Sequence, residues 1–282
     1  MRYLHILDFF NRPFSKQKNI RLLRWGVLFF YLVNNVQLCF MLDISYGAGR
    51  ISPPLGQDGI SNYALNLLDQ GGVVMAICMM ILLMLCLFGA LITSYKRTFT
   101  FVAFFAAANL TNSTYLLNSG GHHLMLLVLF FLCFVNEKKV EEGSWSNAIN
   151  KGALLAIQIQ ICLVYLVSAL YKILGDVWLE GAAMWHSLML QEYSLPIIYN
   201  NIPDSNLILM IMTYFAIAYQ FLFPILIWIS ATRKWVLILG ILMHLMIAFV
   251  FGLFSFGVAM IICYFSFYIP KLQFSFGNRS IE

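Results

Sequence analysis

The sequence predicts an all-α protein, a polytopic bundle of about eight transmembrane helices with no large soluble domain. Of the 282 residues, 61% are hydrophobic and only 10% are charged, whereas a soluble domain has about a quarter charged residues. The mean hydropathy is +0.82, and the apolar residues fall in runs long enough to cross a bilayer. This composition excludes a soluble enzyme, a nucleic-acid-binding domain and a disordered regulator.

A helix that crosses the hydrocarbon core needs about 20 mostly apolar residues, with a range of roughly 17–25. The segments that approach this length are 22–42, 73–93, 99–117, 121–136, 153–174, 207–230, 235–252 and 254–270. The fourth and the last are short, so we expect them to be tilted, flanked by interface residues or partly buried in protein. No repeat or linker divides the chain, which predicts one domain over residues 1–282.

The basic residues predict that both termini are cytoplasmic. With eight spans, 15 of the 17 Lys and Arg residues fall on one side of the membrane, six of them before residue 25. Arg50 alone falls on the other side, together with seven of the 12 acidic residues, and Lys172 lies within a span. The positive-inside rule assigns the Lys- and Arg-rich side to the cytoplasm. Two long loops, 43–72 and 175–206, are then expected outside, and the second suits a re-entrant or interfacial segment.

The chain carries no recognisable motif for a metal or an activated nucleophile. Its six cysteines lie inside apolar runs and none forms C-x-x-C, so we expect free thiols rather than a disulfide framework or a zinc site. The histidines lack the spacing H-x-x-x-H, and G-x-S-x-G, H-E-x-x-H and P-loop sequences are absent. We therefore expect no metal centre.

Lys172 stands near the outer end of the fifth expected span. Ionisable groups at membrane depth are costly and usually face a partner or a cavity. Gln160, Ser168 and Lys172 are spaced by multiples of four, which predicts that they share one helix face, with Tyr165 adjoining. Lys172 would then act as a base in a dry pocket. The alternative is a lysine that extends to the outer headgroups.

Histidines and acids supply further candidates. His122 and His123 open the fourth span, and because adjacent helical residues diverge by about 100°, at most one of them points inward. His244 lies near the middle of the seventh span, where it needs a hydrogen-bond partner. Asp176 and Glu180 follow in the outer loop. Two interpretations stay open: histidines with a structural role, or a functional cluster in the outer half of the membrane.

The run from Gln160 to Gly181 resembles the signature of the horizontally transferred transmembrane domain. This is the membrane domain of vitamin K-dependent gamma-carboxylases and their bacterial relatives. The family pattern is a glutamine, Val-Tyr, a lysine and Trp-x-Glu-Gly, matched here by Gln160, Val164-Tyr165, Lys172 and Trp178-Leu-Glu180-Gly181, with one extra residue before Trp178. The resemblance implies that Lys172 is the base that deprotonates a reduced isoprenoid quinone.

Two flanking motifs extend the resemblance over most of the chain. Gly121-His122-His123-Leu is similar to the family's Asn-His-Ser-Tyr element, and Met243-His244 followed by Gly252-Leu-Phe254-Ser-Phe is similar to a second His and a Phe-Ser motif. The resemblance implies that His122 and His244 steer protons or polarise a carbonyl, and that Trp178 and Glu180 shape the mouth of the pocket. The other expected pocket residues are Gln160, Tyr165, Ser168, Asp176 and His123.

The vitamin K carboxylases carry a large lumenal domain after the membrane bundle, and this sequence stops at residue 282 without one. The resemblance therefore favours short bacterial relatives such as the sporulation-delaying protein B family, which works with a small partner protein to mature a secreted toxin peptide. We expect a multi-pass protein of a bacterial plasma membrane that matures or modifies a peptide. The alternatives are a quinol-dependent glutamate carboxylase, a non-catalytic binding or immunity protein, and a small transporter.

Overall fold

The computed structural model describes residues 17–48, 50–51, 68–136, 144–190, 200 and 206–267. Within these residues the protein is helical and contains no strand, which confirms the all-α class. The longer helices are α2 (Gln17–Cys39), α5 (Leu68–Ile92), α6 (Lys96–Ser113), α7 (Gly120–Cys133), α8 (Trp145–Ile173), α12 (Asn206–Leu226), α13 (Ser230–Val250) and α14 (Phe254–Cys263). The short ones are α3 (Leu42–Tyr46), α9 (Asp176–Leu179), α10 (Ala183–Met189) and a final 3-10 turn, η1 (Tyr264–Phe267).

Five of these helices are long and apolar enough to cross a membrane: α2, α5, α8, α12 and α13. α7 and the α14–η1 segment are apolar but shorter, and α6 is not among the five. The protein is therefore a helical protein embedded in a membrane. Each of the eight expected segments contains a helix. Eight crossings and cytoplasmic termini stay predictions.

Two helices begin at other residues than the expected spans: α8, whose first turns are polar, and α5, which is interrupted by a glycine. α8 begins at Trp145 instead of 153, because the Ser144 hydroxyl caps it by accepting a hydrogen bond from the Asn147 N–H, 3.3 Å away. The side chain of Asn150, in the next turn, pairs with the backbone of Asn136. In α5, Gly72 has a left-handed φ of 55° and interrupts the helix just before the expected start at 73.

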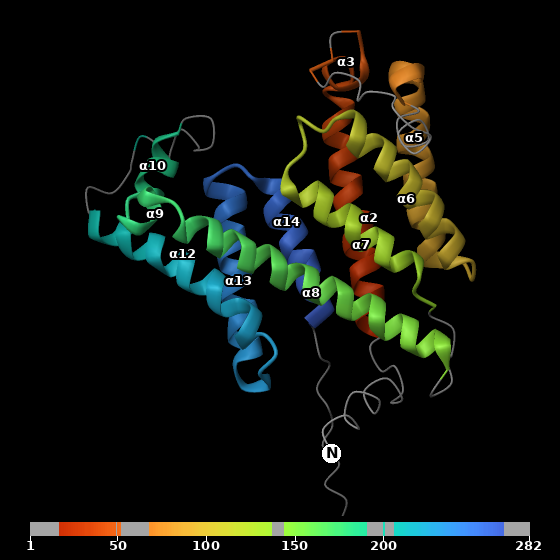
Figure 1. The fold of residues 1–282 in the computed structure, drawn as a ribbon. Helices are drawn as coiled ribbons and strands as arrows, with labels where there is room; N and C mark the ends of the chain where they lie inside the picture. The colour runs from red at the N-terminus through yellow and green to blue at the C-terminus, as the bar shows by residue number, and fades with distance from the viewer. Residues whose placement is uncertain are drawn as a thin grey trace, which may run out of the picture.

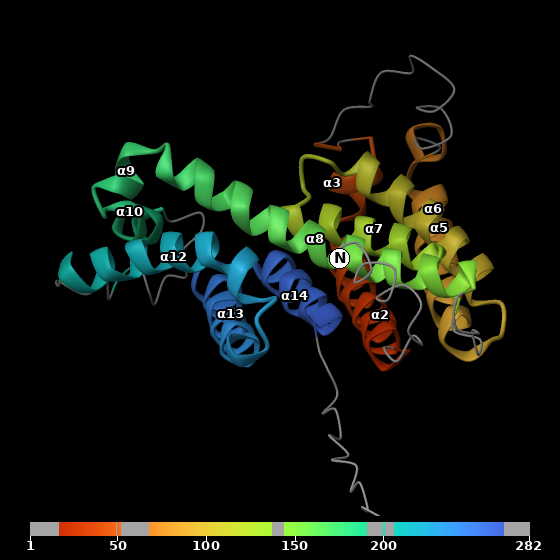
Figure 2. The same cartoon turned by 60° about the horizontal axis from the view of Figure 1, so that its bottom comes forward.

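α8 runs across the whole molecule and joins two groups of helices (Figures 1 and 2). The amino-terminal half consists of α2, α5, α6 and α7, which lie at one end of α8. The carboxy-terminal half consists of α9, α10, α12 and α13 at the other end. α14 lies between the two groups, against α2 and α7 on one side and α13 on the other.

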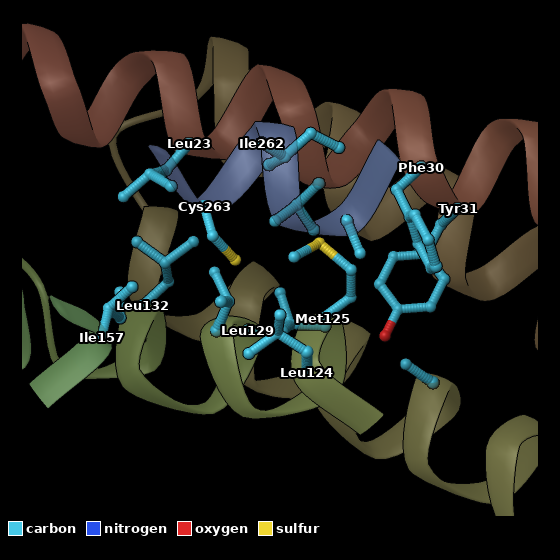
Figure 3. Close-up of a cluster of buried hydrophobic side chains, with 14 of the residues drawn as sticks. Leu23, Phe30, Tyr31, Leu124, Met125, Leu129, Leu132, Ile157, Ile262 and Cys263 are labelled. Carbon is cyan, nitrogen blue, oxygen red and sulfur yellow. The ribbon is translucent and has the colours of Figure 1, made fainter. Parts of the chain in front are cut away.

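The main core lies where α2, α7 and α14 meet (Figure 3). Side chains from α2 (Leu23, Phe30), α7 (Met125, Leu129) and α14 (Cys263) interlock there, each at most 3% exposed. Lipid is as apolar as these side chains, so dense packing and small residues hold the helices together. A second, smaller cluster joins α10 to α12 through Met184, Leu188 and Leu209.

The two expected outer loops are described in part. The segment 175–206 contains α9 and α10, while residues 191–199 and 201–205 lie outside the described residues. The loop 43–72 contains most of α3, and residues 52–67 lie outside the described residues. A re-entrant or interfacial position for 175–206 stays a prediction.

Candidate functional site

A cavity of about 290 Å³ lies in the carboxy-terminal half, walled by α8, α9, α10, α12 and α13 and the first turn of α14. Most of its wall is apolar, with three methionines and three aromatic rings: Met184, Met243, Met246, Trp178, Phe251 and Phe256. Four polar residues also border it: Ser168, Lys172, Ser187 and Gln220. An apolar pocket with a few convergent polar groups is the usual form of a ligand site.

Lys172 is the one charged residue among the described residues that line this cavity. It occupies the last turn of α8, where the helix dipole favours a cation. Its Nζ lies 4.6 Å from the centre of the Trp178 ring, a cation–π contact. Trp178 is placed there by α9, which begins directly after α8 ends and Gly175 turns the chain. The helix end, the turn and the ring together hold the ammonium beside the cavity.

The other polar groups of the wall have open hydrogen-bonding capacity. The hydroxyls of Ser168 and Ser187 make no hydrogen bond with the described residues. The Gln220 Oε1 atom is fully buried and accepts no hydrogen bond within this part of the chain. Ser168 and Ser187 are only half-buried, so within this group it is the Gln220 Oε1 atom that lacks the partner which buried polar atoms in proteins nearly always have.

A phenol–imidazole cluster supports one wall of the cavity. The Tyr165 hydroxyl lies 2.6 Å from His244 Nε2 and also contacts the Tyr264 hydroxyl. The His244 ring packs edge-on against Phe256, a cavity residue, with ring centres 5.7 Å apart. Gly240 makes room for this cluster, since a Cβ there would overlap the hydroxyl of Tyr264. His244 Nδ1 has no partner among the described residues.

His122 lies in a separate centre between α2, α7 and α14. The Ser119 backbone N–H donates to His122 Nδ1 over 3.1 Å, so Nε2 carries the proton and donates to Asn34 Oδ1 over 2.8 Å. The Ser119 hydroxyl lies 3.0 Å from that of Ser255, the neighbour of Phe256 in α14. Both ring nitrogens of His122 are therefore paired, and His122 does not line the cavity.

The remaining candidates lie outside the cavity wall. Gln160 is half-buried on α8, and Asp176, Glu180 and His123 are exposed. Glu180 borders a different hollow of about 390 Å³ on the α9–α10 side. The structure thus brings Lys172, Ser168 and Trp178 together, joins Tyr165 to His244 beside them, and places His122 elsewhere. No group of three His, Cys, Asp or Glu side chains that could hold a metal occurs among the described residues.

Sequence reasoning missed Gln220, Ser187, Asn34 and Ser255. Gln220 carried a usable signal, because it is an isolated amide in the apolar run Phe215–Ile225. On α8 it is Gln158 rather than Gln160 that bonds across helices, with its Nε2 donating to the Ser266 carbonyl over 2.7 Å. Asn34 and Ser255 gave no separate signal, since only the fold places them near His122.

A family model of the HTTM domain matches residues 60–271. The chain belongs to the HTTM domain family. The matched part of this HTTM protein contains the cavity, the Tyr165–His244 cluster and His122, but not Asn34. No curated protein and no solved structure matches the chain.

Proposed function

We propose that this HTTM protein modifies a secreted or membrane-bound peptide in the cavity around Lys172, as a step in the maturation of that peptide. The observation that carries the proposal is the wall of the cavity, which gathers one cation, two hydroxyls and one carboxamide among otherwise apolar side chains. Membership of the HTTM family and its resemblance to the vitamin K carboxylases support chemistry in this bundle.

The residues take distinct roles in this proposal. The Lys172 ammonium pairs with an acidic group of the substrate, and its neutral form accepts a proton. Ser168 and Ser187, which both donate and accept hydrogen bonds, orient the polar end of the substrate. His244 and Tyr165 hold the wall in place. In the same proposal the chain forms a single domain in a bacterial plasma membrane. The peptide enters the cavity from the outer face past the segment 175–206, and a small partner protein assists.

A second candidate is a quinol-dependent glutamate carboxylase, favoured by the apolar and aromatic wall. The residues fit a reduced isoprenoid quinone: Trp178, Phe251 and Phe256 offer flat contacts for a ring, and Lys172 can receive a proton from a ring hydroxyl. Such a quinol would be oxidised by dioxygen, and this oxidation would drive the removal of the glutamate proton that carbon dioxide replaces. The chain itself would bind and orient the quinol, exclude water from the cavity and hold the proton at Nζ of Lys172.

Intact-mass spectrometry of small secreted peptides tests the proposal. Cells would carry wild-type protein, Lys172→Met, Lys234→Met or none. Lys234 is the matched control, because its Nζ lies 5.6 Å from the centre of the Trp235 ring but the pair is exposed and outside the cavity. We expect one peptide whose mass changes with wild-type protein and Lys234→Met only. An added carbon dioxide selects the carboxylase, and another change selects a different maturation step.

Identical peptide profiles in all four strains, with each variant present in the membrane by immunoblot, would overturn the catalytic proposal. A binding, immunity or transport role would then explain the cavity. If Lys234→Met abolishes the mass change as well as Lys172→Met, the effect belongs to loss of surface charge and not to the cavity.

A further inference from the structure

The hollow of about 390 Å³ that Glu180 borders lies between the α9–α10 turn and the first turns of α12. α9 and α10 pack against α12 at this end of the molecule (Figures 1 and 2). Among the described residues, the hollow and the cavity beside Lys172 share no lining residue. The wall of the hollow is mostly apolar, and Glu180 is the one charged side chain among the described residues that line it.

The turn that carries Glu180 is attached to α12 on both sides of this residue. Before it, the Leu179 carbonyl accepts a hydrogen bond from the Tyr214 hydroxyl over 2.7 Å. After it, Gly181 has a left-handed φ of 77° and lies so close to α12 that a Cβ there would overlap the Met210 side chain. The backbone of Glu180 is therefore held against α12 at the edge of the hollow.

A carboxylate and an indole ring in one hollow suit an organic cation. Trp185 lines the same hollow, and its ring meets the His186 ring at 84°, with the ring centres 4.9 Å apart. A carboxylate accepts charge-assisted hydrogen bonds from an ammonium or a guanidinium group, and the face of an indole ring attracts the same cations. The exposed Glu180 carboxylate makes no ion pair with the described residues, so a partner can reach it.

The charge of the surrounding segment favours a cation of a protein over a cation of a lipid. Residues 175–206 include no Lys or Arg and four acidic residues: Asp176, Glu180, Glu192 and Asp204. A zwitterionic phospholipid carries a phosphate beside its ammonium, and an acidic segment repels that phosphate. A Lys or Arg side chain brings the cation alone, and its aliphatic stem can lie against Leu209 and Met210 in the wall.

We propose that this hollow is the docking point for a Lys or Arg side chain of a protein or peptide partner, with Glu180 as the counter-ion and Trp185 as the aromatic contact. The inference goes beyond the proposed function, because it requires no chemistry at Lys172. It assigns to the protein a partner that presents a basic residue to the segment 175–206.

The test is a binding experiment on the purified full chain in phosphatidylcholine nanodiscs, read by microscale thermophoresis against empty nanodiscs. The probes are acetyl-Leu-Arg-Leu-amide and the same peptide with citrulline in place of arginine. Citrulline keeps the shape of the side chain and removes its charge. We expect it to weaken binding to wild-type protein by about ten-fold, the combined worth of one partly exposed ion pair and one cation–π contact.

Variants assign the effect to the hollow. Glu180→Gln removes the charge of an exposed side chain and should lower the preference for arginine over citrulline to about two-fold, the part that the indole ring supplies. Asp176→Asn is the matched control, since Asp176 is an exposed acid of the same segment that does not line the hollow, and it should keep the ten-fold preference. Trp185→Leu should weaken binding of the arginine peptide by about three-fold.

Each outcome decides the assignment. Equal binding of the two peptides to wild-type protein, or no binding of either, overturns it. A preference that Glu180→Gln and Asp176→Asn lower equally also overturns it, because the effect then belongs to the general charge of the segment. If phosphatidylethanolamine in the nanodisc abolishes binding of the arginine peptide, the hollow holds a lipid headgroup and the assignment to a protein partner is wrong. The wild-type comparison needs no variant, so a folding defect does not leave the question open.

Discussion

His122 and His244 are both buried in apolar helices, with 7% and 1% of their surfaces exposed, yet their surroundings differ. His122 has partners at both ring nitrogens, Ser119 and Asn34, and belongs to the tight contact between α2, α7 and α14. His244 has one partner, Tyr165, and one open nitrogen beside a cavity wall. The number of partners and the distance to a cavity, more than the residue type, separate a structural histidine from one that supports a site.

The largest effect on stability is expected at Gly121, where α7 packs against α14. A Cβ on Gly121 would lie 2.7 Å from the Ser255 carbonyl oxygen and 2.8 Å from Phe256 Cα, and these backbone atoms cannot move aside as a flexible side chain could. We expect Gly121→Val to lower the free energy of unfolding by about 3 kcal/mol, seen as a lower melting temperature in detergent. Gly152→Ala on α8 is the control, because nothing lies within 4 Å of a Cβ there. Equal melting of the two variants would show that the contact is looser than described.

Direct replacement of the two histidines sharpens the comparison. His122→Leu leaves Asn34 Oδ1 and the Ser119 N–H without their partner and should destabilise the protein by about 2–3 kcal/mol. His244→Leu removes one hydrogen bond together with one unpaired nitrogen, so we expect a loss of about 1 kcal/mol. Thermal unfolding in the same detergent measures both. If His244→Leu lowers the melting temperature more than His122→Leu does, the number of hydrogen-bond partners does not explain the difference between the two histidines.

Two buried tyrosines should respond in opposite directions when each is replaced by phenylalanine: one variant should be less stable than wild type and the other more stable. Tyr165→Phe removes the hydroxyl that His244 and Tyr264 share, and we expect a loss of about 1.5 kcal/mol. Tyr31 is 2% exposed in the main core, and its hydroxyl has no hydrogen-bond partner among the described residues. Tyr31→Phe should therefore raise stability by about 1 kcal/mol. A destabilised Tyr31→Phe variant would reveal a donor or acceptor outside the described residues.

The smallest effect on stability is expected at the contact between Lys172 and Trp178 in the cavity wall. Trp178→Leu removes the ring under Lys172 and should change stability by no more than about 1 kcal/mol, the worth of a partly exposed cation–π contact. It should nevertheless weaken the binding of an acidic peptide, because the ammonium loses its fixed position. Trp235→Leu breaks the exposed pair with Lys234 and should leave peptide binding unchanged. Equal binding by both variants would remove Trp178 from the site.

Helices could be predicted from the sequence far better than their contacts. Each expected span contains a helix because backbone hydrogen bonds must be satisfied locally in lipid, and hydropathy detects that requirement. Hydropathy failed at the start of α8, where Asn147, Asn150 and Lys151 are helical and buried against neighbouring segments. Polar residues that pair across helices look the same in a sequence as polar residues at a helix end.

The cavity site could be predicted only in part, because sequence patterns report contacts between residues close in the chain and not contacts between distant helices. Lys172, Ser168 and Trp178 are close in the chain, so helical spacing and one turn suffice to bring them together. Gln220 reaches the cavity only because α12 folds back along α8, a pairing that no local pattern encodes. The family resemblance made His122 a candidate together with Lys172, and in the structure the His122 side chain pairs with Asn34 and does not line the cavity.

The length of α8 has a consequence for the depth of the site. Its 29 residues form a rod about 43 Å long, and the hydrocarbon core of a bilayer is about 30 Å thick. A rod of this length that crosses the bilayer lies tilted or extends into the headgroups. Because Lys172 stands in the last turn of this rod, a thicker or thinner bilayer changes the immersion of its ammonium. For a crossing α8, lipid chain length would therefore set how deeply the Lys172 end of the cavity lies in the membrane.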